Sequence, residues 1–179
     1  MGREPFEAVM TAHHAEIHRY LRRLTFQSPE AEDLSQETFV RAFRAYRALP
    51  PDANVRAWLF AIATNLFRNS LRAAKRRRAA HDTVKKRGRD DDGDGPEGAA
   101  RFNEARAAVE AVIDALPVKQ RAAFVMRKIH ELPYDEIAKS LACSSDSARA
   151  HVFQAFRKIR IALDDTQLRA AEGTPEESA

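Results

Sequence analysis

The sequence has few of the residues that build disulfide-bonded, zinc-binding or membrane-spanning proteins. Its single cysteine, Cys143, cannot form an internal disulfide or supply the clustered thiolates of a zinc site. No apolar run approaches the roughly 18 residues that a membrane helix needs, and the first residues lack the apolar core of a signal peptide. With only 6 glycines in 179 residues the chain is not fibrous. These absences predict a globular, cytoplasmic protein.

Motifs for catalysis are also missing. The chain has no glycine-rich phosphate loop, no supported Ser/His/Asp grouping and no defensible pair of catalytic carboxylates. His14 and His18 have a spacing that metals use, but the glutamate that follows the first histidine in metalloproteases is absent. We therefore expect no enzyme activity, no cofactor and no metal. Cys143 is interpreted as a small buried residue, with a redox sensor as the alternative.

What the sequence does have is a concentrated positive charge. The chain carries 30 Lys and Arg against 26 Asp and Glu, a net charge of +4. Residues 1–78 carry 14 against 8, or +6, and seven of the 14 lie from Arg56 to Arg78. A local basic stripe attracts polyanions even when the whole protein is only mildly basic.

Apolar residues recur at three- and four-residue spacing through the first half, which predicts three helices. Ser28 is expected to be the N-cap of the second helix, with Pro29 at its first position, and Pro50-Pro51 is expected to stop this helix. The apolar positions are Phe6, Val9, Met10, Ile17, Tyr20, Leu21 and Leu24, then Leu34, Phe39, Phe43 and Tyr46, then Val55, Trp58, Leu59, Ile62, Leu66 and Leu71. We expect one helical domain over residues 1–78.

Residues 79–101 have a different composition, with one β-branched aliphatic residue, four glycines and an acidic run. Such a segment buries too little apolar area to offset chain ordering, which costs about 1–2 kcal/mol per residue. It predicts a flexible linker, with a second helical domain over 102–168. Residues 169–179 are expected to be a disordered acidic tail. The predicted fold is all-α, with two small helical domains and a linker.

The second half contains a predicted helix-turn-helix. One short helix is expected over Tyr134–Leu141 and another from Ser145 to about Leu163, with Ser144 as the N-cap of the second. Its inward stripe is Ala148, Val152, Ala155/Phe156, Ile159 and Leu163, and its outward residues are Ser145, Ser147, Arg149, Ala150, His151, Gln154, Arg157 and Lys158. These outward side chains suit contacts with base edges and phosphates in a major groove. The alternative is an ordinary helical hairpin with a solvated polar face.

The expected helix over residues 54–75 carries the basic stripe. Asn65, Arg68, Asn69, Arg72 and Lys75 recur at three or four residues, so they share a face opposite Trp58, Ile62 and Leu66. Two amides among positive side chains suit base contacts within a phosphate-binding surface. The following Arg76–Arg78 is equally consistent with a solvated basic helix end.

Four of these segments together resemble a known family. Ala31–Phe39 and Trp58–Asn65 resemble the N-terminal conserved domain of bacterial extracytoplasmic-function (group IV) RNA polymerase sigma factors. Ala115–Arg121 and Tyr134–Ala138 with the helix-turn-helix resemble their C-terminal domain. The resemblance covers both domains in the correct order. It implies a stress-response type of transcription initiation factor, with core RNA polymerase, promoter DNA and an anti-sigma factor as partners.

The resemblance also implies roles for individual residues. Core polymerase would be contacted by Asp33, Gln36, Glu37, Phe39 and Arg41, although Phe39 is equally consistent with the core. The −10 element would be met by Asn54, Asn65, Arg68, Asn69, Arg72, Lys75, Arg76 and Arg77, with the loop over 49–54 capturing a flipped base. The −35 element would be read by Arg149, His151 and Gln154, with Ser145, Ser147 and Arg157 as positioning contacts.

Two residues depart from the family pattern. Asn69 stands where Asp is frequent, and it replaces a carboxylate acceptor with an amide that both donates and accepts. Ala142 stands where Gly is usual in the turn, at a cost of about 1 kcal/mol if the position needs a positive φ. The competing hypothesis is an autonomous helix-turn-helix regulator whose N-terminal domain dimerises or senses a ligand.

Overall fold

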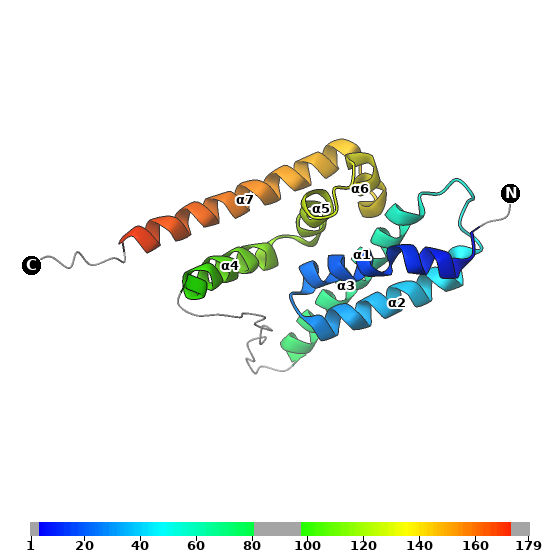
Figure 1. Cartoon of the computed structure of the whole chain (residues 1–179), viewed down its shortest axis with the longest axis horizontal. Helices are drawn as coiled ribbons and strands as arrows, with labels where there is room; N and C mark the ends of the chain where they lie inside the picture. The colour runs from blue at the N-terminus through cyan, green and yellow to red at the C-terminus, as the bar shows by residue number, and fades with distance from the viewer. Residues whose placement is uncertain (1–3, 81–97, 173–179) are drawn as a thin grey trace, which may run out of the picture.

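The computed structural model describes residues 4–80 and 98–172, and these residues form seven helices without a strand (Figure 1). The all-α prediction is confirmed. The helices are α1 (Phe6–Thr25), α2 (Ser28–Tyr46), α3 (Val55–Ala80), α4 (Gly98–Ala115), α5 (Val118–Lys128), α6 (Tyr134–Leu141) and α7 (Ser145–Glu172). In this part of the chain no helix is long and apolar enough to cross a membrane.

Helices α1, α2 and α3 pack together as the N-terminal half. The connection between α1 and α2 turns at Phe26, whose φ of 55° ends α1 in the left-handed region. Gln27, not the predicted Ser28, is the N-cap of α2; it provides no side-chain cap bond, and Pro29 fills the first turn. The Thr25 hydroxyl instead accepts a bond from the Gln27 amide at 3.2 Å. The α2 start is thus stabilised from the preceding helix.

The buried stripe of α3 differs from the predicted one. The fully buried positions include Leu59, Phe60, Ala63 and Phe67, whereas Trp58 and Ile62 are only half-buried. The buried face of α3 is therefore rotated by about one residue relative to the predicted face. The reason is that α3 packs on α1, α2 and α6 at once, so its apolar surface is wider than a single stripe.

Helices α4 to α7 form the C-terminal half, in which α4 lies beside α7 (Figure 1). Helices α6 and α7 form the predicted helix-turn-helix. Ala142 adopts φ 48° and ψ 58°, so the turn does place a non-glycine residue in the left-handed region. The Ser147 amide donates to the Ser144 hydroxyl at 3.1 Å, which confirms Ser144 as the N-cap of α7. Phe156 is 48% exposed and does not belong to the inward stripe.

The two halves share one hydrophobic core. Buried residues from α1, α2 and α3 form a single cluster with buried residues from α5, α6 and α7. The closest packing between the halves joins α3 to α6 and α1 to α5 (Figure 1). Arg121 of α5 also donates to the backbone carbonyl of Leu24 at 2.8 Å, and its guanidinium lies 5.3 Å from the centroid of the Phe67 ring.

The boundaries of the predicted linker and tail are partly helical. Helix α3 continues to Ala80 and α4 already begins at Gly98, so both ends of the 79–101 segment are helix. Residues 169–172 of the predicted tail belong to α7. Residues 81–97 and 173–179 lie outside the described residues, so the remaining linker and tail predictions are not tested. Composition alone placed these boundaries, and it does not show how far an adjoining helix extends.

Candidate nucleic-acid and polymerase interface

The exposed face of α7 begins directly after the turn. Arg149, Ala150, Gln154 and Arg157 are exposed there, as the sequence predicts. Phe153 is exposed as well, with 66% of its surface accessible. The helical spacing had placed Phe153 in neither the inward stripe nor the outward face, so its exposure was not predicted. Its position one turn after Arg149 places an apolar ring on the same surface, where it suits a thymine methyl group.

Two further residues lie beside Arg149. The guanidinium carbons of Arg149 and Arg127 lie 5.0 and 4.9 Å from the centroid of the Tyr134 ring. Arg127 is held by a hydrogen bond from its Nη1 to the carbonyl of Leu132 at 3.1 Å. A surface hollow of about 320 Å³ is lined by Arg127, Pro133, Tyr134, Asp135, Ser145 and Arg149. Two arginines stacked on one aromatic ring present donors suited to a phosphate group.

Two other predicted DNA-contacting residues of α7, Ser147 and His151, are less available for contacts with DNA. Ser147 accepts a hydrogen bond from the Ser144 hydroxyl at 2.9 Å, so it belongs to the helix cap. His151 is only partly exposed, and its Nδ1 is buried without a described partner. Burial lowers the pKa of His151, and the nearby Lys119 charge lowers it further. His151 is therefore neutral at pH 7.

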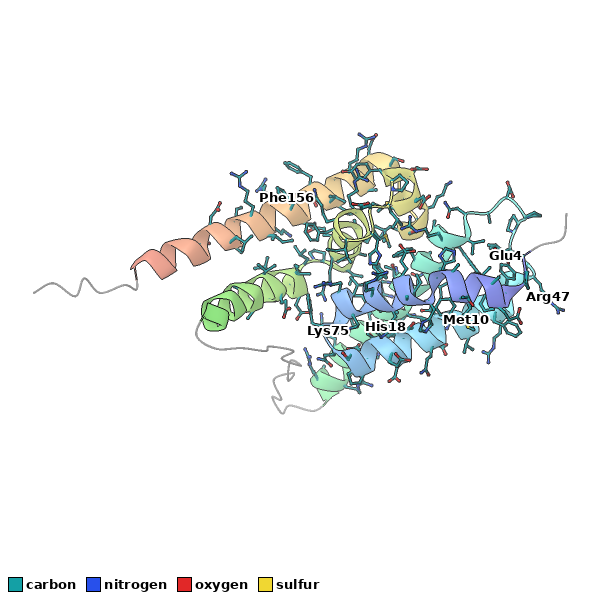
Figure 2. All side chains as sticks on the ribbon, viewed as in Figure 1. Glu4, Met10, His18, Arg47, Lys75 and Phe156 are labelled. Atoms are coloured by element: carbon teal, nitrogen blue, oxygen red, sulfur yellow. The ribbon has the colours of Figure 1, made fainter. Side chains whose placement is uncertain are left out.

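The predicted −10 face of α3 is largely exposed. Its open residues are Asn65, Asn69, Arg72, Lys75, Arg76 and Arg77, with Lys75 toward the end of the helix (Figure 2). Arg68 is half-buried and donates from Nη2 to the Asn65 side-chain oxygen at 2.7 Å. Asn54 precedes α3, and its side-chain oxygen accepts from the Ala57 amide at 2.8 Å. Asn54 thus serves as the helix cap, a role the sequence analysis had not assigned to it.

The predicted polymerase face of α2 needs one correction. Asp33, Gln36 and Arg41 are exposed, and Arg41 Nε donates to Glu37 Oε1 at 2.6 Å. Phe39, by contrast, is 6% exposed and belongs to the core. The outward apolar residues of α2 are Val40 and Phe43, which are 43% and 62% exposed. Residues 39 and 43 are one turn apart on nearly the same side of α2. A small rotation of the helix therefore determines which of the two rings is buried.

A charged cluster lies where the two halves meet. Arg56 of α3 holds both carboxylate oxygens of Glu16 in α1, at 2.5 and 3.1 Å. The same guanidinium donates to the carbonyl of His130 at 2.9 Å and lies 3.7 Å from Glu136. His130 Nδ1 in turn lies 3.5 Å from Glu16. This cluster, the Glu16–Arg56–His130 junction, was not visible in the sequence because its members are 40 and 74 residues apart.

A helix-turn-helix with an exposed basic and amide face, and a second basic helix, define a helical DNA-binding protein. Family models match both halves: sigma-70 region 2 over residues 9–89 and sigma-70 region 4 over residues 106–159. The RNA polymerase sigma-H factor of Pseudomonas aeruginosa is 30% identical over 165 residues, covering 88% of this chain and 86% of the relative. The chain belongs to the extracytoplasmic-function family of RNA polymerase sigma factors. It is an alternative sigma factor that directs transcription initiation.

Other sigma factors are similar to this chain in sequence or in structure. The Mycolicibacterium smegmatis sigma factor SigE is 29% identical over 160 residues, covering 87% of this chain and 60% of the relative. The sigma factor RpoE of Bartonella quintana, solved with the anti-sigma factor NepR, has a TM-score of 0.68 at 19% identity over 89% of this chain and 96% of RpoE. CnrH, solved with the cytosolic domain of CnrY, has a TM-score of 0.66 at 24% identity over 89% of this chain and 88% of CnrH. At these identities the structural likeness establishes the fold.

Proposed function

We propose that the two halves divide promoter recognition between them. Residues 1–78 dock on core RNA polymerase and meet the −10 element, and residues 102–168 read the −35 element. The observation that carries this proposal is the pairing, on one chain, of an open amide-and-arginine face on α3 with an open reading face on α7. The protein acts by binding alone, without catalysis of its own, and works in the cytoplasm beside polymerase and DNA.

The α2 surface is the proposed polymerase contact. Asp33, Gln36, Glu37 and Arg41 offer polar contacts around the exposed rings and methyl groups of Phe43 and Val40. A patch of exposed apolar side chains with a polar rim is the usual anatomy of a protein interface. Phe39 supports this surface from beneath, since it is buried.

The α3 surface is the proposed −10 contact. Asn65, Asn69 and Arg72 face solvent and can contact base edges exposed by strand melting. Lys75, Arg76 and Arg77 add charge that suits the phosphate backbone. Asn54 acts indirectly: as the cap of α3, it fixes where the loop over 49–54 enters the helix. That loop is the proposed site for a flipped base.

The α7 surface is the proposed −35 contact. Arg149 and Gln154 are the proposed base readers, with Phe153 against a thymine methyl group and Arg157 on the backbone. The hollow between Arg127, Tyr134 and Ser145 is proposed to take a backbone phosphate. His151 contributes through packing, because it is partly buried and uncharged.

An anti-sigma factor is the proposed negative partner. RpoE was solved in complex with the anti-sigma factor NepR, and CnrH in complex with the cytosolic domain of CnrY. We propose that this chain also binds an anti-sigma factor, which holds it inactive. Purified chain mixed with a candidate anti-sigma protein should form a complex that lacks transcriptional activity.

Run-off transcription with core polymerase tests the proposed function. We expect specific transcripts when the full chain is added to core enzyme, and little promoter binding by the free chain. No product above core alone on any genomic promoter contradicts the proposal. A strong mobility shift on a palindromic site without polymerase would instead favour an autonomous regulator.

A further inference from the structure

Three polar side chains form a hydrogen-bonded relay beside the reading face of α7. Lys158 Nζ donates to Gln120 Oε1 at 3.0 Å, and Gln120 Nε2 donates to Gln154 Oε1 at 2.7 Å. Gln120 belongs to α5, whereas Gln154 and Lys158 lie one turn apart on α7. All these contacts lie on the protein surface. We call this set the Lys158–Gln120–Gln154 relay.

The chemistry of lysine gives the relay a direction. An ammonium group can only donate, so the end of Gln120 that meets Lys158 must be its amide oxygen. The NH₂ group of Gln120 then faces Gln154, which must meet it with an oxygen. Gln154 is left with its own NH₂ group turned away from α5. No described residue accepts a hydrogen bond from that group.

We propose that Gln120 and Lys158 are positioning residues that make Gln154 a hydrogen-bond donor to DNA, and that Gln154 thereby selects guanine over adenine. This inference rests on the proposed function of α7 as the −35 reader. In the major groove guanine presents two acceptors, N7 and O6, whereas adenine presents one acceptor and one donor. A glutamine recognises adenine by using both its oxygen and its NH₂ group. In this protein the oxygen is already engaged by Gln120.

The position of Gln154 fits this role. It is exposed, and it lies one turn after Ala150 and next to Phe153, the exposed ring of the same face. The relay also restricts the rotation of a flexible side chain, so less conformational entropy is lost when Gln154 meets a base. Gln120 and Lys158 therefore influence base choice without contacting the base themselves.

Run-off transcription from promoters randomised in the −35 region tests the inference, using the full chain with core polymerase. For the wild type we expect guanine to exceed adenine about five- to tenfold at one −35 position. Gln154→Ala should bring that ratio close to one at this position alone. Gln120→Ala should also relax it, because the amide of Gln154 is then free to turn.

The decisive variant is Lys158→Glu, which replaces a donor-only group by an acceptor-only group. Gln120 should then turn its NH₂ group toward residue 158 and its oxygen toward Gln154. The oxygen of Gln154 would face the DNA, and the preference should shift to adenine or cytosine, which both present an N–H donor. The added negative charge weakens binding to every sequence by a similar factor. This factor cancels when transcription from two promoters that differ in one base is expressed as a ratio.

Arg160→Glu is the matched control. It makes the same change of charge on the same helix, and Arg160 is 74% exposed with Asp164 as its ion-pair partner. Its base ratios should equal those of the wild type. The inference is overturned if Lys158→Glu gives the same ratios as Arg160→Glu, or if Gln154→Ala changes none. A wild type that is indifferent to every −35 base would contradict the proposed function itself.

Discussion

Ser140, in the first helix of the helix-turn-helix, donates a hydrogen bond to the backbone carbonyl of Ala57 in α3 at 2.9 Å, and it shares this proton with the carbonyl of Glu136 in its own helix, which is also 2.9 Å away. The bond to Ala57 is buried and joins residues 83 positions apart. Together with the Glu16–Arg56–His130 junction, it ties the C-terminal half to the N-terminal half. The two halves therefore stabilise one another in this arrangement.

Ser140→Ala should lower the free energy of unfolding by about 0.5–1.5 kcal/mol, because one buried hydrogen bond is lost. Urea denaturation followed by circular dichroism measures the change. Thr11→Ala is the control, since it removes a comparable bond to the carbonyl of Glu7 on an exposed helix face. Equal effects of the two variants would show that the bond between the halves adds nothing.

Glu16→Gln should destabilise the protein by about 1.5–3 kcal/mol at pH 7, because it removes the carboxylate that Arg56 holds with two hydrogen bonds and leaves only Glu136, 3.7 Å away, as its charged partner. Partial burial raises the pKa of Glu16, but the bonds from His13, His130 and Arg56 outweigh it and hold this pKa far below its usual value of 4.5. A lowered carboxyl pKa stabilises the fold above the unfolded value and loses this effect as the pH falls.

The difference between wild type and Glu16→Gln should therefore be constant above about pH 5 and shrink as the pH falls below about 4.5. Denaturation curves at pH 7, 5, 4 and 3 measure it. A difference that grows on acidification would contradict the stabilising role of the ionised carboxylate.

Ala142→Gly should stabilise the protein by about 0.5–1 kcal/mol, since glycine adopts the observed φ of 48° without a Cβ clash. The gain is reduced by the greater entropy of glycine in the unfolded chain. Ala15→Gly, at an exposed position within α1, should instead cost about 1 kcal/mol. Thermal and urea denaturation of both variants measure this difference. Destabilisation by both substitutions would contradict the prediction.

Phe39→Ala should cost about 3–5 kcal/mol of stability, because it empties a buried site. Phe43→Ala should cost less than about 1 kcal/mol, since the ring is 62% exposed and packs edge-on against Phe6 at 5.5 Å. In a core-polymerase pull-down, Phe43→Ala should lower binding while the chain remains folded. Full binding by folded Phe43→Ala would remove this residue from the proposed polymerase surface.

Arg127→Ala should weaken transcription by a similar factor on all −35 sequences, because a phosphate contact carries no base information. The slope of log affinity against log salt should fall by about one. Arg149→Ala should instead change which bases are preferred. Transcription from the randomised −35 promoters at several salt concentrations separates the two, and identical base profiles would contradict the division of roles.

The sequence was most informative where structure is decided locally. The bounds of α6 and the Ser144 cap both depend on residues within a turn or two, so spacing and side-chain chemistry were sufficient to predict them. Phe39 could not be distinguished from Phe43 in this way, because both lie on one side of α2 and only the packing of α1 decides which is covered.

The contacts that join distant parts of the chain could not be predicted. Arg56 and His130 are polar residues in unremarkable surroundings of the sequence, and only the fold brings them together around Glu16. The same holds for Arg127 and Tyr134, which belong to different helices and meet Arg149 from a third. Periodicity reports which residues share a helix face, but it does not report which helix that face will meet.

The contact between Ala57 and Ser140 limits how far apart the exposed faces of α3 and α7 can be. At about 1.5 Å per residue, Lys75 lies about 27 Å along α3 from Ala57, and nine residues of chain hold Arg149 within about 32 Å of Ser140. Elements centred about 25 base pairs apart are separated by roughly 85 Å of B-DNA. Under the proposed function, this reach is shorter than the separation of the two elements on straight B-DNA, so the chain in this arrangement binds one element at a time. Weakening the junction should therefore lower fold stability while easing simultaneous capture of both.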